Sequence, residues 1–288
     1  MELKHIAAEA GRLSSFLQRE LQMSSGLINK LKWGDSIRVN GIPQRTNYSV
    51  QPGDVITVTL EAEEPEYPAQ DGPLDILYED DFLLAVDKPA GMLIHPSRSK
   101  FDGTLANYVL GYYARTGQRC AFHPMTRLDR DTFGIVLLAK NPHIHTLLQQ
   151  TPVRKTYHAL TYGGPARDRG TIDAPIARMP LPSLLRYVNP DGKPSLTEYK
   201  VLYRGDELCK LALRPVTGRT HQLRLHCLHM GFPILGDPQY NTESSADFSA
   251  RMGLTHQLLC ARRLEFAHPI TGQPMVLESG MDVQCDQL

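Results

Sequence analysis

Apolar side chains recur with two different periods in the first part of the chain. Residues 12–21 are apolar at every third or fourth position, and a second stripe of this kind follows Ser24 and Ser25, either of which suits a helix cap. Short β-prone runs come next, at 36–39 and 55–60, with turn residues between them. The pattern predicts a small separate module with two helices followed by a few short strands.

A stretch rich in proline and glutamate separates this module, residues 1–60, from the rest of the chain. Residues 61–73 contain three prolines and several carboxylates but no Lys or Arg. Such a segment is extended and repels itself, so it predicts a linker that lets the module move. Its negative charge also disfavours a polyanion lying along it.

Residues 74–288 are expected to form a second, larger domain made mostly of strands. Apolar runs at 76–78 and 82–86 flank three acidic residues and predict a hairpin. Helices are predicted at 103–115, with Thr104 as the cap, and at 221–230. Further strands are predicted at residues 136–139, 157–162, 197–203 and 209–213. The expected fold class is α+β.

Composition excludes several classes of protein. No apolar run approaches the about 20 residues that span a bilayer, and the N-terminus lacks a secretory signal pattern. The five cysteines are an odd number, widely spaced and without a CxxC pair. This usage favours reduced thiols over a disulfide framework or a structural zinc site. We therefore expect a cytoplasmic protein with no membrane partner.

The net charge of zero hides an uneven distribution. Residues 1–45 carry three more positive than negative charges and residues 88–288 carry eight more, whereas residues 46–87 carry eleven carboxylates and no Lys or Arg. Phosphate is attracted by the local field rather than by the net charge. A nucleic acid partner is therefore compatible with the composition, although ordinary solvated surfaces can sum to the same values.

Asp129 is the strongest candidate for chemistry. It lies between Arg127 and Arg130 in a turn-prone stretch, directly before the apolar run 135–139. Close cations favour the charged form of a carboxylate, and an ionised carboxylate beside a core strand suits a nucleophile or a general base. Asp131 is a rival two residues away, and a simple salt bridge in a loop is the other interpretation.

Four further segments accompany Asp129 in a fixed order. They are DKPAGMLIHP at 87–96, RKTYHAL at 154–160, GRTHQLRLH at 218–226 and GFPILGD at 231–237. With these motifs, residues 74–279 resemble the pseudouridine synthases of the RluA type. The resemblance implies a large mixed, mostly antiparallel sheet with a central catalytic cleft.

The resemblance also implies a reaction, the isomerisation of uridine to pseudouridine in ribosomal or transfer RNA. The glycosidic carbon–nitrogen bond breaks, the uracil rotates and it rejoins the sugar through carbon. No redox change occurs, so no cofactor is expected, and the chain carries neither a dinucleotide loop nor a P-loop. A metal is not expected either, because His221, His226 and His229, with Cys227 nearby, do not place three ligands on one helix face.

By the same resemblance, Asp129 is the catalytic carboxylate, with Arg219 and Tyr157 beside it. The guanidinium of Arg219 is expected to bind the carboxylate in two places and keep it ionised. Tyr157 is expected to stack on the extruded base and is a candidate general base. A phosphate or sheet contact for Arg219 and a core position for Tyr157 are the alternatives. Thr126 and Phe133 replace the His and Ser that the family usually has, which affects substrate fit and rate.

Other residues within the family motifs are expected to contact RNA. Arg127 is expected to enter the RNA stack and to hold the target base outside it. Lys88 and His95 are expected to frame the cleft or to contact phosphate. The remaining substrate-binding candidates are Arg130, Arg154, Lys155, His221, Gln222 and Arg224.

The first 60 residues resemble the α-L RNA-binding motif of a small-subunit ribosomal protein, which many enzymes of this type carry. The start of its second helix, usually basic, is the neutral Ser24-Ser25-Gly26 here, which predicts weak RNA binding. The candidate phosphate contacts are Arg12, Arg19, Lys30, Lys32, Arg38 and Arg45. An inert small domain is the alternative.

Two other functions remain to be weighed. One is an RNA-binding or ribosome assembly factor of the same fold that has lost activity. The other is a hydrolytic glycosidase built on Asp129 and Asp131, but nothing places these carboxylates on opposite faces of a sugar. No obligate protein partner is expected, and a monomer is the default.

Overall fold

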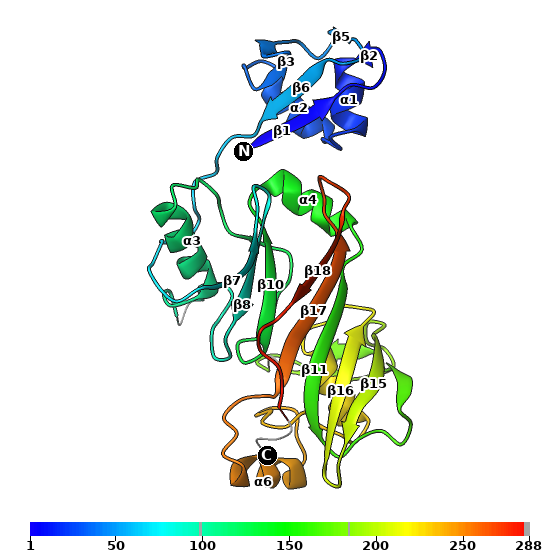
Figure 1. Ribbon diagram of the computed structural model, residues 1–288. Helices are drawn as coiled ribbons and strands as arrows, with labels where there is room; N and C mark the ends of the chain where they lie inside the picture. Colours follow the sequence, from blue (N-terminus) through cyan, green and yellow to red (C-terminus); the bar gives the residue numbers. More distant parts are fainter. Residues whose placement is uncertain (98–99, 184, 285–288) are drawn as a thin grey trace.

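The computed structural model describes residues 1–97, 100–183 and 185–284. A small module formed by the first 60 residues lies at one end of an elongated molecule, and one large sheet runs through the rest (Figure 1). Helix α6 (Glu243–Arg251) lies at the opposite end. The architecture confirms the α+β class.

Two short helices and a four-stranded sheet make up most of the module. Helices α1 (Leu13–Arg19) and α2 (Ser25–Leu31) are where the pattern predicts them, and the Ser24 hydroxyl oxygen caps α2 by accepting the Leu27 N–H at 3.2 Å. The strands are β1 (Glu2–Ile6), β2 (Gly11–Arg12), β3 (Ile37–Val39), β4 (Ile42–Pro43), β5 (Ser49–Val50) and β6 (Val55–Thr59). The sequence pattern does not reveal β1, which pairs with β6, because Leu3 is its one fully buried residue.

The linker is held against the large domain rather than free. The Gln70 side-chain oxygen accepts the Gly103 N–H at 2.8 Å, and Asn107 Nδ2 donates to the Pro68 carbonyl at 2.9 Å. These contacts lie at the start of α3 (Leu105–Arg115). Hydrogen bonds that a charge pattern does not reveal therefore anchor the second half of the segment, while the expected movement of the module stays a prediction.

The module also packs directly on the large domain. His143, at the start of α4 (Pro142–Gln150), has its Nε2 3.0 Å from the carbonyl oxygen of Leu21. One apolar cluster includes Leu17 of the module together with Ile144 and Leu147 of α4. The module thus contacts the large domain directly as well as through the linker.

Ten strands form the large sheet. They are β7 (Asp75–Glu79), β8 (Leu83–Lys88), β9 (His123–Pro124), β10 (Phe133–Ala139), β11 (Arg154–Tyr162), β12 (Arg169–Asp173), β15 (Leu196–Arg204), β16 (Leu208–Pro215), β17 (Leu259–Ala267) and β18 (Pro274–Glu278). The order is β12-β15-β16-β11-β17-β10-β8-β7, with β9 beside β10 and β18 beside β17. All these pairs are antiparallel except β10 with β17. The predicted hairpin (β7–β8) and the other four predicted strands are confirmed.

The helices of the large domain are only partly anticipated. Helix α3, capped by Thr104, and helix α5 (Gln222–His229) confirm the two predictions. Helices α4 and α6 and strands β17 and β18 have no counterpart in the sequence interpretation. A hairpin of β13 (Ile176–Arg178) and β14 (Arg186–Val188) contacts α5. Across the described ranges, the helices are too short or too polar to cross a bilayer.

The short parallel seam between β10 and β17 fixes the centre of the sheet. Phe133 and Gly134 lie in register with Cys260 and Ala261 across it. Gly134 has φ +105°, and a Cβ at this position would lie 2.4 Å from the Ala261 carbonyl oxygen. Only glycine fits this close approach, and it anchors the end of the loop that carries Asp129.

Candidate active site

A cavity of about 400 Å³ opens beside this seam. Its walls come from three segments that are distant in sequence: the loop that carries Asp129, strand β11 with Lys155 and Tyr157, and residues 217–224 at the start of α5. The sheet brings them together because β10, β17 and β11 are consecutive neighbours. The three predicted catalytic residues, Asp129, Tyr157 and Arg219, therefore line one cavity.

The cation that contacts Asp129 is Arg224, not Arg219. Arg224 Nη1 donates to Asp129 Oδ2 at 3.0 Å, whereas Arg219 Nε donates to the carbonyl of Pro194 at 3.2 Å. The predicted pairing of Arg219 with Asp129 is wrong, because Arg219 lies in the turn before α5 and Arg224 lies on the buried side of the helix. Arg219 remains a cationic wall of the cavity.

The two neighbouring carboxylates have separate partners. Arg130 binds Asp131 with both ends of its fork, Nε to Oδ1 at 3.0 Å and Nη2 to Oδ2 at 2.9 Å. Arg130 is thus a surface cation engaged by Asp131, not a partner of Asp129 and not a cavity residue. This arrangement leaves Asp129, with 31% of its side chain exposed, as the carboxylate that faces the cavity.

Arg224 is the buried hub of the site. Its side chain is 5% exposed and binds Asp237, which is fully buried, with Nε–Oδ2 at 2.6 Å and Nη2–Oδ1 at 2.7 Å. The Tyr240 ring lies 4.9 Å from the guanidinium. Burial alone lowers the pKa of Arg224, but the hydrogen bonds and charges of Asp237 and Asp129 outweigh it and raise the pKa. One fixed cation therefore serves two carboxylates, and the surplus negative charge faces the cavity at Asp129.

His221 completes this network. It adopts a left-handed backbone conformation, φ +57°, immediately before α5, and such strain is concentrated at functional sites. Its Nδ1 lies 2.9 Å from the Tyr240 hydroxyl, and its Nε2 lies 4.0 Å from Asp129 Oδ1. Burial lowers the pKa of His221 although Asp129 opposes this effect. A neutral imidazole beside the carboxylate is therefore favoured.

Tyr157 reaches the cavity because β11 is irregular at this point. The register with β17 shifts between Thr156 and Tyr157, and bulges of this kind often redirect side chains at active sites. Burial, with a smaller contribution from Asp129, raises the pKa of Tyr157. A phenol held neutral is a stacking surface and a hydrogen-bond donor, and it is not a ready base.

The remaining charged residues of the cavity are cations. Arg127 and Lys155 line it together with Arg219. Burial lowers the pKa of Lys155, and no carboxylate opposes this effect. A cationic group that is partly desolvated and has no acidic partner favours an anionic ligand such as a phosphate.

Lys88 and Gln222 support the site through buried hydrogen bonds. Buried Lys88 donates to the carbonyls of Pro89, Met92 and Arg130, each at 2.9 Å, and thereby clamps the Asp129 loop. The amide of buried Gln222 forms four hydrogen bonds, to Thr217, Leu196, Thr197 and the Arg219 N–H. Lys88 therefore takes the first of its two expected roles, that of framing the cleft. Gln222 lies on the cavity wall, and its substrate contact stays a prediction.

His95 and Arg154 also lie outside the cavity wall. The His95 ring packs edge-on against Phe122 and Tyr67. Burial, followed by the charge of Arg127, lowers the pKa of His95. Arg154 is exposed at the start of β11. Asp237 and Tyr240 are the functional positions that the sequence interpretation left without a role, although Asp237 closes the fourth family motif.

Lys88 gives a prediction about pH. Burial lowers its pKa to about 8 although Asp131 and Asp129 oppose this effect, whereas an ordinary lysine in the unfolded chain titrates near 10.5. Between these pH values the unfolded state binds more protons, so the Lys88 contribution to the free energy of unfolding rises with pH. Urea unfolding of wild type and Lys88→Met across this window measures the difference, which is expected to grow by at most about 1.4 kcal/mol per pH unit. A constant difference contradicts the prediction.

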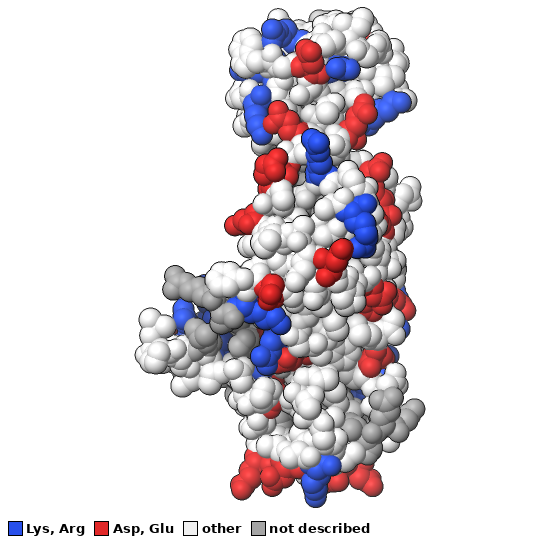
Figure 2. Space-filling view, turned by 90° about the vertical axis from the view of Figure 1, so that its left-hand side faces the viewer, with Lys and Arg blue, Asp and Glu red and all other residues white. Residues whose placement is uncertain are grey.

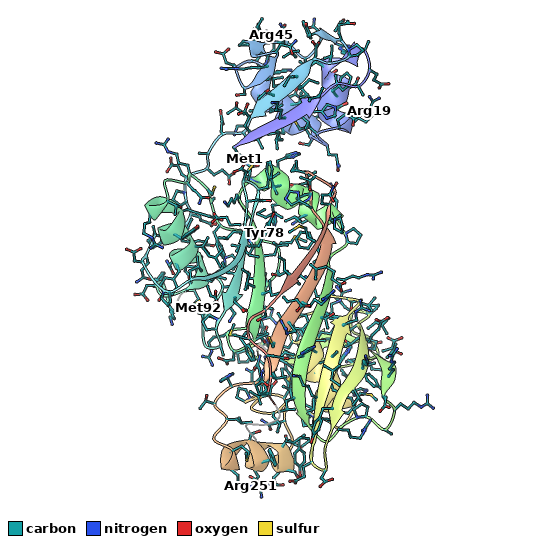
Figure 3. The ribbon with its side chains drawn as sticks, in the orientation of Figure 1. Met1, Arg19, Arg45, Tyr78, Met92 and Arg251 are labelled. Atoms are coloured by element: carbon teal, nitrogen blue, oxygen red, sulfur yellow. The ribbon has the colours of Figure 1, made fainter. Side chains whose placement is uncertain are left out.

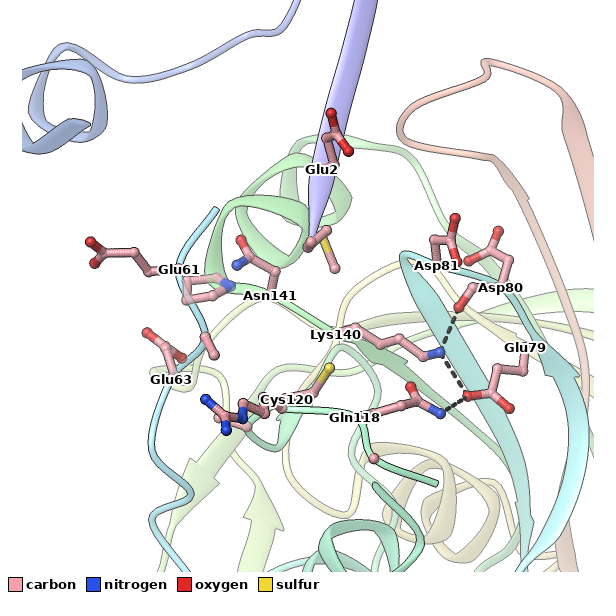
Figure 4. A pocket seen from close by; sticks show the side chains of 16 residues that line it. Glu2, Glu61, Glu63, Glu79, Asp80, Asp81, Gln118, Cys120, Lys140 and Asn141 are labelled. Atoms are coloured by element: carbon pink, nitrogen blue, oxygen red, sulfur yellow. Dashed lines mark hydrogen bonds and ion pairs between the residues drawn. The ribbon is translucent and has the colours of Figure 1, made fainter. Parts of the chain in front are cut away.

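A larger cavity, of about 770 Å³, lies between the module and the large domain. Its labelled side chains include six carboxylates, from Glu2, Glu61, Glu63, Glu79, Asp80 and Asp81 (Figure 4). Lys140 is engaged there, with its Nζ 2.7 Å from Glu79 Oε1. Such a lining repels phosphate, and no cluster of three His, Cys, Asp or Glu able to hold a metal was found within the described residues.

The basic residues of the module are not equivalent. Arg19 pairs with Glu9 and Glu20, and Lys30 pairs with Glu61. Figure 2 shows these mixed charges on the module, with no continuous basic face on the side in view. Arg12, Lys32, Arg38 and Arg45 form no ion pair with a carboxylate in the part of the chain that the structure describes.

Comparison with known proteins agrees with this geometry. A family model described as RNA pseudouridylate synthase matches residues 82–229. An uncharacterised RNA pseudouridine synthase of Bacillus subtilis is 36% identical over 263 residues, which cover 89% of this chain and 90% of the relative. Ribosomal large subunit pseudouridine synthase C of Vibrio vulnificus is 33% identical over 294 residues, which cover 96% and 91% of the two chains.

A solved structure supports the same assignment. Human RNA pseudouridylate synthase domain containing 1 aligns with a TM-score of 0.58 and 26% identity, over 76% of this chain and 94% of that one. Sequence motifs, sheet topology and both kinds of comparison lead to one family. The chain therefore belongs to the RNA pseudouridine synthases of the RluA type, enzymes that isomerise uridine in RNA to pseudouridine.

Proposed function

We propose that this enzyme isomerises a uridine of large-subunit ribosomal RNA and that Asp129 is its catalytic carboxylate. The position of Asp129 carries the second part of the proposal: Arg224 holds it at 3.0 Å on the wall of a cavity whose other charged residues are cations. The substrate class rests on two relatives that are named ribosomal large subunit pseudouridine synthases C and D.

The reaction exchanges an N1–C1′ bond for a C5–C1′ bond. N1 gains a hydrogen and C5 loses one, so the product is an isomer and no electrons enter or leave. A carboxylate can begin this exchange by attacking the sugar, by attacking the base or by removing a sugar proton. Each route requires a carboxylate beside the ribose–base junction, and the hydrogen bond from Arg224 fixes the position of Asp129 on the cavity wall.

The cavity walls supply the other needs of the reaction. A uridine in a stem must leave the base stack, which costs a few kcal/mol, so the site has to offer a replacement surface. Tyr157 offers an aromatic face next to Asp129, and Arg127, Lys155 and Arg219 are available for the flanking phosphates. Such a substrate is found in the cytoplasm, where we expect the enzyme to act as a monomer.

Mapping of pseudouridine in ribosomal and transfer RNA from cells that lack this protein tests the proposal. We expect one or a few uridines of large-subunit ribosomal RNA to lose the modification and to regain it when the wild-type gene is restored. Loss confined to transfer RNA contradicts the substrate class. If every site persists, an RNA-binding factor without activity becomes the better description.

A further inference from the structure

An exposed aromatic residue lies on the module, away from the catalytic cavity. Trp33 follows α2, is the single tryptophan of the chain and is 72% exposed. The Arg45 guanidinium lies 4.9 Å from the centre of its ring, and Lys32 Nζ lies 5.2 Å from it. Arg45 is labelled at the end of the module that points away from the large domain (Figure 3). So large a ring, left in water, contributes little to the core.

Hydrogen bonds hold the two cations beside Trp33, and neither cation is neutralised by a carboxylate in the described parts of the chain. Arg45 Nη1 donates to the Lys32 carbonyl at 3.0 Å, which holds the guanidinium near the ring, and Lys32 Nζ donates to Asn29 Oδ1 at 2.9 Å. Neither forms an ion pair with a carboxylate within the described residues, in contrast to Lys30. Residues 29–46 contain four cations and one carboxylate. The surroundings of Trp33 are therefore complementary to a polyanion.

We propose that Trp33, Lys32 and Arg45 form a platform on which an unpaired base of structured RNA stacks, with the two cations contacting the adjacent phosphates. The platform rests on the proposed function in that its ligand is the RNA substrate. A base must be free of its own stack to lie on an indole, so the ligand is a loop or a bulge and not a regular duplex. The enzyme thus holds its RNA at two separate points, the catalytic cavity and this platform.

Because Trp33 is the single tryptophan, its fluorescence reports on this platform alone. The probe is an unmodified in vitro transcript of bacterial large-subunit ribosomal RNA, titrated into the full-length protein. We expect quenching that saturates with the same Kd as filter binding. Unchanged tryptophan emission at saturating RNA overturns the proposal. The same result is expected if the ligand of Trp33 is a protein and not RNA.

Variants measure the energetic contribution of the ring. Trp33→Ala is expected to raise the Kd for this transcript about tenfold and to leave kcat unchanged, whereas Trp33→Phe keeps an aromatic face and stays within about threefold of wild type. Tyr203→Ala removes an aromatic residue that is 50% exposed on the large domain and is expected to have no effect. Equal Kd values for wild type and Trp33→Ala overturn the proposal.

The two proposals fail in distinguishable ways. If the transcript quenches Trp33 and Trp33→Ala binds it weakly, but no pseudouridine forms, the proposed substrate is wrong and the platform stands. The opposite outcome is that pseudouridine forms in the transcript, but the Trp33 emission does not change and Trp33→Ala has the Kd of wild type. In that case the proposed function stands and the platform is wrong.

Discussion

Asp129→Asn is expected to lower kcat for pseudouridine formation by a factor on the order of 10³ or more while the Kd for RNA stays near that of wild type. The amide oxygen can still accept the hydrogen bond from Arg224 Nη1, which the carboxylate accepts at 3.0 Å. Arg224 also keeps its charged partner Asp237, so the buried pair survives the change. What the variant loses is the negative charge that faces the cavity, and all three chemical routes require it.

Asp131→Asn is the matched control. It makes the same chemical change two residues away, at a carboxylate that binds Arg130 outside the cavity. We expect kcat to remain within about tenfold of wild type, because Asp131 lies outside the cavity and an amide can still accept a hydrogen bond from Arg130. Single-turnover assays with the modified RNA, together with filter binding, measure both effects. Loss of activity in Asp131→Asn with activity retained in Asp129→Asn assigns the chemistry to the rival carboxylate.

The local signals of the sequence were sufficient where a cap or a clear period is present. Thr104 and Ser24 mark the starts of α3 and α2 as expected. The pattern does not indicate helix α4, because Pro142 resembles a helix breaker. Proline is nevertheless favoured in the first turn of a helix, and Asn141 supplies the cap. Strand β18 shows no clear alternation, because only one of its five residues, Leu277, is buried.

In the candidate site, too, the sequence indicates what depends on local motifs and does not indicate what depends on the tertiary fold. The motifs place Asp129 and Tyr157 at the site, since each of them lies within a recognisable segment. The motif does not tell Arg219 from Arg224 as the partner of Asp129, because both arginines lie within it and only the direction of α5 decides which of them turns inward. The sequence does not indicate the role of Asp237, because that role depends on a guanidinium thirteen residues away in sequence.

Arg224→Met is expected to cause the largest loss of stability that this site can produce. It leaves the fully buried carboxylate of Asp237 without a cation, and breaking a buried pair in this way costs roughly 3–5 kcal/mol of unfolding free energy. It also removes the contact that holds Asp129 in place, so pseudouridine formation is expected to be lost. Urea unfolding and single-turnover assays measure the two effects.

Arg219→Met is the matched control for this change. Arg219 precedes α5, and its side chain donates to one carbonyl, that of Pro194, at 3.2 Å. Its removal leaves no buried charge behind, so we expect a stability change below about 1 kcal/mol. Two outcomes contradict the assignment of Arg224 as the hub. One is that Arg219→Met lowers the free energy of unfolding as much as Arg224→Met does, and the other is that Arg224→Met leaves it unchanged.

The double variant Arg224→Met/Asp237→Asn separates folding from catalysis. An uncharged amide at position 237 can still accept the backbone N–H groups of Gln239 and Tyr240, which the carboxylate accepts at 2.9 and 3.0 Å, and it no longer needs a cation. Much of the lost stability is therefore expected to return, because the penalty arises from the unpaired buried charge. Activity is expected to stay lost, since Asp129 still lacks its partner. If activity returns together with stability, Arg224 serves only the fold, and Asp129 does not need this contact for the reaction.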